Sequence, residues 1–193
     1  DGEETAPVAA GTYTVVATVD ETDWQGAVTG VLTIAQAPAT VTLAGLQQVF
    51  DGAVKSVTAT TDPAGLAVVL TYNGSPVAPT NAGCYAVTAR VDEANYTGLA
   101  TGTLMVAKAA AAVTLNGLAQ TYDGSPRVVT AMTVPGGLTV DFTYDGQASA
   151  PTVPGTYAVT GTVNDVNWQG SAADTLVVAK GSQTIDFPAL GDQ

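Results

Sequence analysis

The sequence repeats itself every 72 residues without a gap, and this feature constrains the fold more than any other. Three kinds of motif recur at this spacing: Gly-x-Tyr, aromatic-x-Gly, and an aromatic residue followed by Asp-Gly or Asn-Gly. They begin at Gly11, Gly83 and Gly155; at Trp24, Tyr96 and Trp168; at Phe50 and Tyr122; and at Tyr72 and Tyr144. Self-similarity at a fixed spacing is typical of arrays of small modules, each of which packs against its neighbours in the chain.

The repeat divides the chain into complete and partial modules. Residues 38–109 and 110–181 are predicted to be complete β modules, residues 1–37 the C-terminal part of a module, and residues 182–193 the first strand of a further module. When residues 182–193 are aligned with the start of the preceding module, Ile185 falls on Val113 and Phe187 falls on Leu115. Because part of a module cannot bury its apolar face alone, we expect these residues to belong to a longer array.

Each module is predicted to consist of short strands in which apolar residues alternate with polar ones. The clearest strand places Tyr85, Val87, Ala89 and Val91 on one face, and the other copies repeat this pattern. The remaining strands of the second copy are marked by Val41 and Leu43; Val57, Ala59 and Thr61; Val68, Leu70 and Tyr72; and Leu104 and Val106.

Turn residues separate these strands. The pairs Asn73-Gly74 and Asp145-Gly146 suit tight hairpins, and so do Asp51-Gly52 and Asp123-Gly124. The tyrosine that follows a glycine at the start of the clearest strand predicts a tyrosine corner. The whole pattern predicts an all-β fold built from tandem immunoglobulin-like β-sandwich modules of about 72 residues.

Composition disfavours several functions. With 17 acidic and 5 basic residues the net charge is −12, so we expect no binding to nucleic acid. The apolar runs are too short to span a bilayer, so we expect no direct membrane insertion. Histidine is absent, which removes the usual base for nucleophilic catalysis, and we expect no enzyme and no catalytic, cofactor-binding or metal-binding residue. Cys84 is the only cysteine; it excludes an internal disulfide, and we expect it to be a small, half-buried strand residue.

The acidic loops before the aromatic-x-Gly motifs are the best candidates for calcium at module junctions. Their acidic residues are Asp20, Glu21 and Asp23; Asp92 and Glu93; and Asp165. Their spacing is not that of an EF-hand, and Asn164 and Val166 replace Asp20 and Thr22 in the last copy, so a solvated turn is favoured. The aromatic residues that follow could stack on sugars, but their identical placement favours packing under the loop or at a junction.

The lysines offer one further site to consider. Lys108 and Lys180 recur where a linker is expected to begin, but Gln36 occupies the matching position in the first copy. Lys55 is replaced by Arg127 in the next module. Both replacements disfavour an intramolecular isopeptide bond.

Several motifs, taken in order, resemble those of the MBG and YDG repeat families of bacterial surface proteins and adhesins. They are Tyr122-Asp123-Gly124, Tyr72-Asn73-Gly74, the segment 82–85, the segment 95–98 and a closing strand over 103–108. The resemblance covers nearly the whole chain and implies an extracellular all-β repeat used in the stalks of secreted or cell-wall proteins. Some relatives have a β-grasp-like fold, which is the alternative topology. Phe50 departs from the usual Tyr, and the family supplies no catalytic residues to carry over.

The leading hypothesis is therefore a structural stalk or spacer of a large bacterial cell-surface adhesin or fibre protein, whose partners are the neighbouring modules of the same chain. Short linkers around residues 107–112 and 179–182 would leave those neighbours little angular freedom. One alternative is an adhesive module whose repeats bind glycans or proteins weakly and gain by multivalency. Another is self-association into filaments through β-edge pairing.

Overall fold

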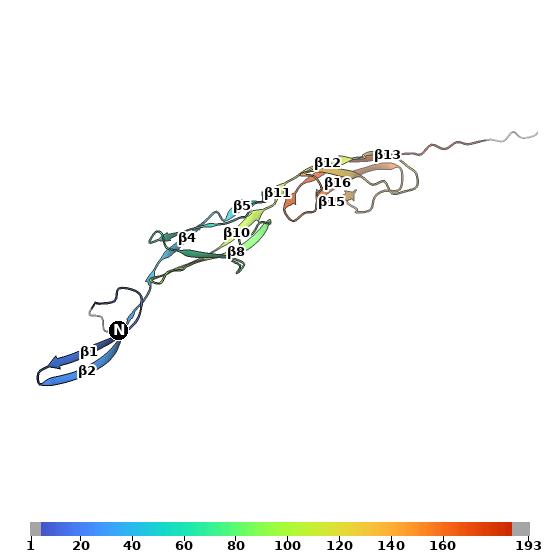
Figure 1. The fold of residues 1–193 in the computed structure, drawn as a ribbon. Coiled ribbons are helices and arrows are strands. Elements are labelled where there is room, and N and C mark those ends of the chain that lie inside the picture. The colour runs from blue at the N-terminus through green and yellow to red at the C-terminus, as the bar shows by residue number, and fades with distance from the viewer. Residues whose placement is uncertain (1–4, 187–193) are drawn as a thin grey trace, which may run out of the picture. The chain divides into compact units, whose positions relative to one another are not determined.

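The structure is a computed structural model that describes residues 5–186, and within that range it contains strands and turns but no helix (Figure 1). The chain divides into two compact units, residues 1–107 and residues 108–193. The first unit contains a two-stranded hairpin and one complete module, and the second contains another complete module.

The complete module of the first unit is a β-sandwich. Its strands are β3 (Ala37–Pro38), β4 (Thr40–Ala44), β5 (Gln47–Val49), β6 (Thr58–Asp62), β7 (Val68–Tyr72), β8 (Gly83–Val91), β9 (Tyr96–Thr97) and β10 (Leu99–Ala107). A four-stranded sheet has the order β5-β10-β8-β7, and β4 pairs with β6 in a second sheet. Leu43 from the second sheet packs on a buried cluster that includes Val87 and Leu104 from the first, so the core lies between the two layers.

The second unit repeats this architecture strand for strand. Its strands are β11 (Ala109–Ala110), β12 (Ala112–Asn116), β13 (Ala119–Thr121), β14 (Thr130–Val134), β15 (Val140–Tyr144), β16 (Gly155–Val163), β17 (Trp168–Gln169) and β18 (Ser171–Ala179). The four-stranded sheet has the order β13-β18-β16-β15, and β12 pairs with β14. The predicted all-β sandwich is confirmed, and the β-grasp-like alternative is not observed, since two strand layers form each described module.

The first segment of each module changes its pairing partner twice, which the alternation of apolar residues did not predict. In the first unit β3 runs parallel to β9, β4 antiparallel to β6, and β5 parallel to β10. Between β4 and β5, Gly45 has a φ of 75°, a left-handed conformation that side chains disfavour. This bend allows a single segment to contribute to both layers, and Leu46 beside it packs on the core.

The predicted strand faces are confirmed. Val87, Ala89, Val91, Leu104 and Val106 are all buried. The expectation for the cysteine was wrong, because Cys84 lies on the outward face of β8 and is exposed. The outward position of Cys84 follows from the period of two in a strand. The next residue, Tyr85, is half-buried and begins the inward-facing positions of β8, so Cys84 faces outward.

The tyrosine corners are confirmed in every copy. The hydroxyl of Tyr85 donates a hydrogen bond to the carbonyl of Asn81 at 2.9 Å. Tyr13 and Tyr157 make the same bond with Ala9 and Val153, at 2.8 and 2.9 Å. The ring lies over the glycine two residues earlier: a Cβ on Gly155 would come within 3.0 Å of the Tyr157 hydroxyl. This contact explains why the motif is Gly-x-Tyr.

The two predicted kinds of turn differ from each other. Asn73 and Gly74 have φ angles of 49° and 83°, the positive pair that a tight two-residue hairpin needs, and Asp145-Gly146 repeats it. Asp51-Gly52 does not form such a hairpin. Its aspartate instead accepts a hydrogen bond from the amide of Ala53 at 2.8 Å, an Asx turn.

The hairpin of β1 (Gly11–Glu21) and β2 (Trp24–Ile34) has the strands of a module's second half, and no described strand forms an opposing layer over it. Val15, Val19 and Leu32 are 48%, 53% and 40% exposed. Their counterparts Val87, Val91 and Leu104 are 1%, 4% and 0% exposed. Burial in the complete modules therefore comes from the opposing layer, not from the hairpin itself.

At the other end of the chain, part of the strand predicted over 182–193 lies outside the described residues. This applies to Phe187 and the residues after it. Residues 182–186, which include Ile185, are described and are not in a strand.

Prediction for the core. In the second unit the buried hydroxyl of Tyr144 accepts a hydrogen bond from the amide of Val129 at 2.9 Å. Tyr144→Phe leaves this buried N–H without its partner and should lower the free energy of unfolding by about 1–3 kcal/mol. Tyr122→Phe, at an exposed ring, is the control and should change it by less than about 0.5 kcal/mol. Equal effects of the two substitutions in chemical denaturation would contradict this account.

Candidate functional site

The loop between β8 and β10 is where each module receives the chain that enters it. In the first unit the entering strand β3 lies along β9, with Ala37 opposite Tyr96. The amide of Ala37 donates to the carbonyl of Asn95 at 2.9 Å, and the amide of Ala39 donates to Thr97 at 2.8 Å. We call residues 92–97 and 164–169 the linker loops, because each pairs with a linker strand.

Side chains strengthen this contact in the first unit. The amide nitrogen Nε2 of Gln36 donates to the carbonyls of Glu93 and Ala94, at 3.1 and 3.0 Å. The side-chain oxygen of Asn95 accepts a hydrogen bond from the amide of Ala10 at 2.8 Å. The linker loop thus holds both the linker and the segment that precedes β1.

The second unit holds its linker in the same way. The amides of Ala109 and Ala111 donate to the carbonyls of Asn167 and Gln169, each at 2.8 Å. Nζ of Lys108 donates to the carbonyl of Asp165 at 2.6 Å. The same contact position is therefore filled by an amide in one unit and by an ammonium in the other.

A glycine at the end of each linker loop allows the linker backbone to come close. A Cβ on Gly98 would lie 2.5 Å from the carbonyl oxygen of Ala39, and a Cβ on Gly170 would collide with the oxygen of Ala111. Real Cβ atoms do not approach this closely. The aromatic-x-Gly motif found in the sequence therefore marks the linker contact, which the sequence alone did not reveal.

The corresponding loop of the hairpin has no linker strand beside it in the described residues. There β1 and β2 continue to pair up to the turn, with Asp20 opposite Gln25 and Glu21 opposite Trp24. Trp24 is 77% exposed, whereas Tyr96 and Trp168 are half-buried. Two of the three aromatic residues are therefore half-buried in a strand that pairs with a linker strand, and Trp24 is not.

Two of the acidic residues considered for calcium, Glu93 and Asp165, accept hydrogen bonds from backbone amides. A carboxylate oxygen of Glu93 accepts from the amide of Ala67 at 3.0 Å. Asp165 accepts from the amides of Asn167 and Trp168 at 2.7 and 2.9 Å. Among the described residues no three acidic, histidine or cysteine side chains gather into a group that could hold a metal ion. The loops are thus more than solvated turns, because they form the surface that receives the linker.

An ion pair closes the turn at Asp51 in the first unit. Lys55 is only 6% exposed, and its Nζ lies 2.5 Å from a carboxylate oxygen of Asp51. The hydrogen bond from Lys55 and the amide of Ala53 hold the pKa of Asp51 below its ordinary value of 3.8. Arg127 pairs with Asp123 at the equivalent place in the second unit. The sequence showed the Lys-to-Arg replacement but gave no sign that these cations are largely buried.

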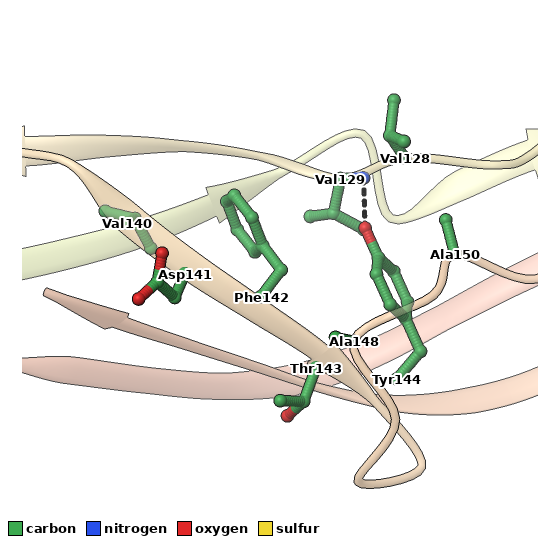
Figure 2. A pocket seen from close by; sticks show the side chains of 9 residues that line it. All are labelled: Val128, Val129, Val140, Asp141, Phe142, Thr143, Tyr144, Ala148 and Ala150. Carbon is green, nitrogen blue, oxygen red and sulfur yellow. Dashed lines mark hydrogen bonds between the residues drawn. The ribbon is translucent and has the colours of Figure 1, made fainter. Parts of the chain in front are cut away.

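A shallow opening lies at the side of the second sandwich. Figure 2 shows that Phe142 and Tyr144 extend from β15 toward Val129, with Asp141 on the same strand. The Tyr144 hydroxyl is bonded to Val129, and Asp141 accepts a hydrogen bond from Asn164 at 2.9 Å. Asp141 is the one carboxylate among the lining residues, so the opening does not supply the carboxylate pair of glycoside hydrolysis.

Prediction for the linker loop. Gly98→Ala places a methyl group against the linker carbonyl and should lower the stability of the first unit by about 1–3 kcal/mol. Gly26→Ala is the matched control, because Gly26 holds the same motif position and its Cβ would meet nothing within 4 Å. Thermal unfolding of the two variants checks this prediction, and it is wrong if Gly26→Ala is the more harmful change.

Prediction for the ion pair. Because folding lowers the pKa of Asp51, the ionised carboxylate stabilises the fold above its unfolded pKa, near 3.8. This contribution is lost as the pH falls through the folded-state pKa. The wild-type chain should therefore be more stable than Asp51→Asn at about pH 7, and the difference should shrink below pH 3.8. Urea unfolding at a series of pH values measures it, and a difference that does not change with pH would refute the prediction.

Comparison with known proteins identifies the family of this chain. No curated protein matches the chain at a significant level. The model of the MBG domain matches three consecutive segments, residues 1–38, 39–110 and 111–182. Domains of this type are typical of bacterial surface proteins. Within the described residues, no helix is long and apolar enough to cross a membrane. With matches over nearly its whole length, the chain belongs to the MBG domain family.

Proposed function

We propose that this chain is a structural spacer: a run of stalk repeats from a large bacterial cell-surface adhesin or extracellular fibre protein. Its partners are the neighbouring modules of the same chain, and its role is mechanical and not enzymatic. The family supports placement on the bacterial surface, and secretion is part of the proposal.

The observation that carries this proposal is the absence of a free linker between the described strands. Strand β10 ends at Ala107 and β11 begins at Ala109, so Lys108 alone lies between them. Ala35 and Gln36 alone separate β2 from β3. Because β3 and β11 are paired with the module that follows, few backbone torsions remain free at each joint. Joints of this kind suit a chain that must hold a distal domain at a distance.

Self-association is the second candidate function, and the sheet edges of the complete modules favour it. Strands β7 and β15 are outer strands of their four-stranded sheets, and each pairs with only one neighbour among the described strands. Exposed strand edges with apolar faces are templates for pairing with another chain. Binding of glycans has less support, since Tyr96 and Trp168 are half-buried in the linker loops.

Small-angle X-ray scattering over a concentration series tests both candidates. A compact globule of this length has a radius of gyration of about 16 Å. The spacer proposal predicts a value larger by more than half that does not change with concentration. A value that rises with concentration would favour self-association, and one near the compact value would contradict the spacer proposal.

A further inference from the structure

We propose that the residue immediately before each linker strand, Gln36 in the first unit and Lys108 in the second, is the positioning residue that docks the linker onto the module that follows. The inference deepens the proposed function and rests on its constrained joint. It assigns to one side chain per joint the task of holding the linker in its loop.

The first support is that both complete modules hold their linker with the same loop. In the first unit the carbonyls of Asn95 and Thr97 accept hydrogen bonds from the linker, and in the second unit those of Asn167 and Gln169 do so. The docking contact therefore recurs with the repeat, and a side chain at the start of the linker lies beside the same loop at each joint.

The second support is that two different side chains reach the same carbonyl. Glu93 and Asp165 are equivalent positions of the repeat, and their backbone oxygens accept hydrogen bonds from Gln36 and Lys108 respectively. An amide and an ammonium share no charge, but both place an N–H donor at the end of a long side chain. The requirement is therefore a donor of sufficient reach, and not a positive charge.

The third support is the location of the contact. The donor at position 36 or 108 comes directly before Ala37 or Ala109, whose amides make the first backbone bonds to the loop. Loss of the Gln36 or Lys108 side-chain hydrogen bond removes the contact that precedes this backbone pairing. The linker strand can then detach from the loop, beginning at its first residue. The cores of the sandwiches lie elsewhere and should not respond.

The test is hydrogen exchange measured by NMR on the full chain carrying Lys108→Met, which keeps an unbranched stem up to Cε and removes the terminal donor. The amides of Ala109 and Ala111 should exchange about 2- to 10-fold faster, as expected for the loss of one hydrogen bond. Amides of β16 and β18 should keep their rates. Unchanged rates at Ala109 and Ala111, or a uniform increase across the second unit, would overturn the proposal.

Two further variants provide matched controls. Lys108→Gln introduces the residue found in the first unit and should keep the exchange rates of Ala109 and Ala111 within about twofold of the original. Lys180→Met makes the same substitution at an exposed lysine of the same repeat position and should leave both rates unchanged. If Lys108→Gln accelerates exchange as much as Lys108→Met, charge is required and the proposal is wrong.

The scattering and exchange experiments together distinguish a failure of the docking inference from a failure of the proposed spacer function. Large, concentration-independent dimensions in scattering together with unaffected exchange would retain the spacer and remove the docking role of Lys108. Compact dimensions together with accelerated exchange would retain the docking contact and remove the spacer.

Discussion

The backbone pairing between each linker strand and the module after it is the interaction on which the rest of this structure depends. Strands β3 and β11 are two residues long, yet each joins the end of one repeat to the loop of the next. A flexible linker would leave the repeats independent. Here each linker strand belongs by its hydrogen bonds to the module that follows it.

The gapless repeat also acts as an internal series of substitutions. Where the residue changes between copies and the contact persists, the shared chemistry identifies what the fold requires. A cation closes the turn after the first strands, an oxygen acceptor is needed at the tight hairpin, and a donor is needed before the linker. The pairs that show this are Lys55 and Arg127, Asn73 and Asp145, and Gln36 and Lys108.

Sequence patterns predicted the features that depend on local rules. Alternation located the core strands, Asn73-Gly74 the tight hairpin, and Gly-x-Tyr the tyrosine corner, because each follows from the conformation of a few adjacent residues. They could not predict the change of partners along β3, β4 and β5, which depends on contacts between residues far apart. For the same reason the aromatic-x-Gly motif was recognised as a repeat, but its role beside Ala39 and Ala111 was not.

The misassigned residues have physical explanations as well. Cys84 was expected to be half-buried because cysteine usually is, but its strand position points outward. Lys55 was assigned no structural role from the sequence. Its side chain is largely buried, and its ammonium group pairs with Asp51. Residue type gives an average tendency, and the strand face or the available partner decides the particular case.

The central claim is that a docked linker restricts motion between modules, and residual dipolar couplings of the full chain test it most directly. The couplings of each unit yield an alignment tensor for that unit. The account predicts that residues 37–107 and 108–180 report tensors of the same magnitude and rhombicity, as parts of one stiff body do. Clearly different magnitudes for the two sets would show that the joint moves freely, and would contradict the account.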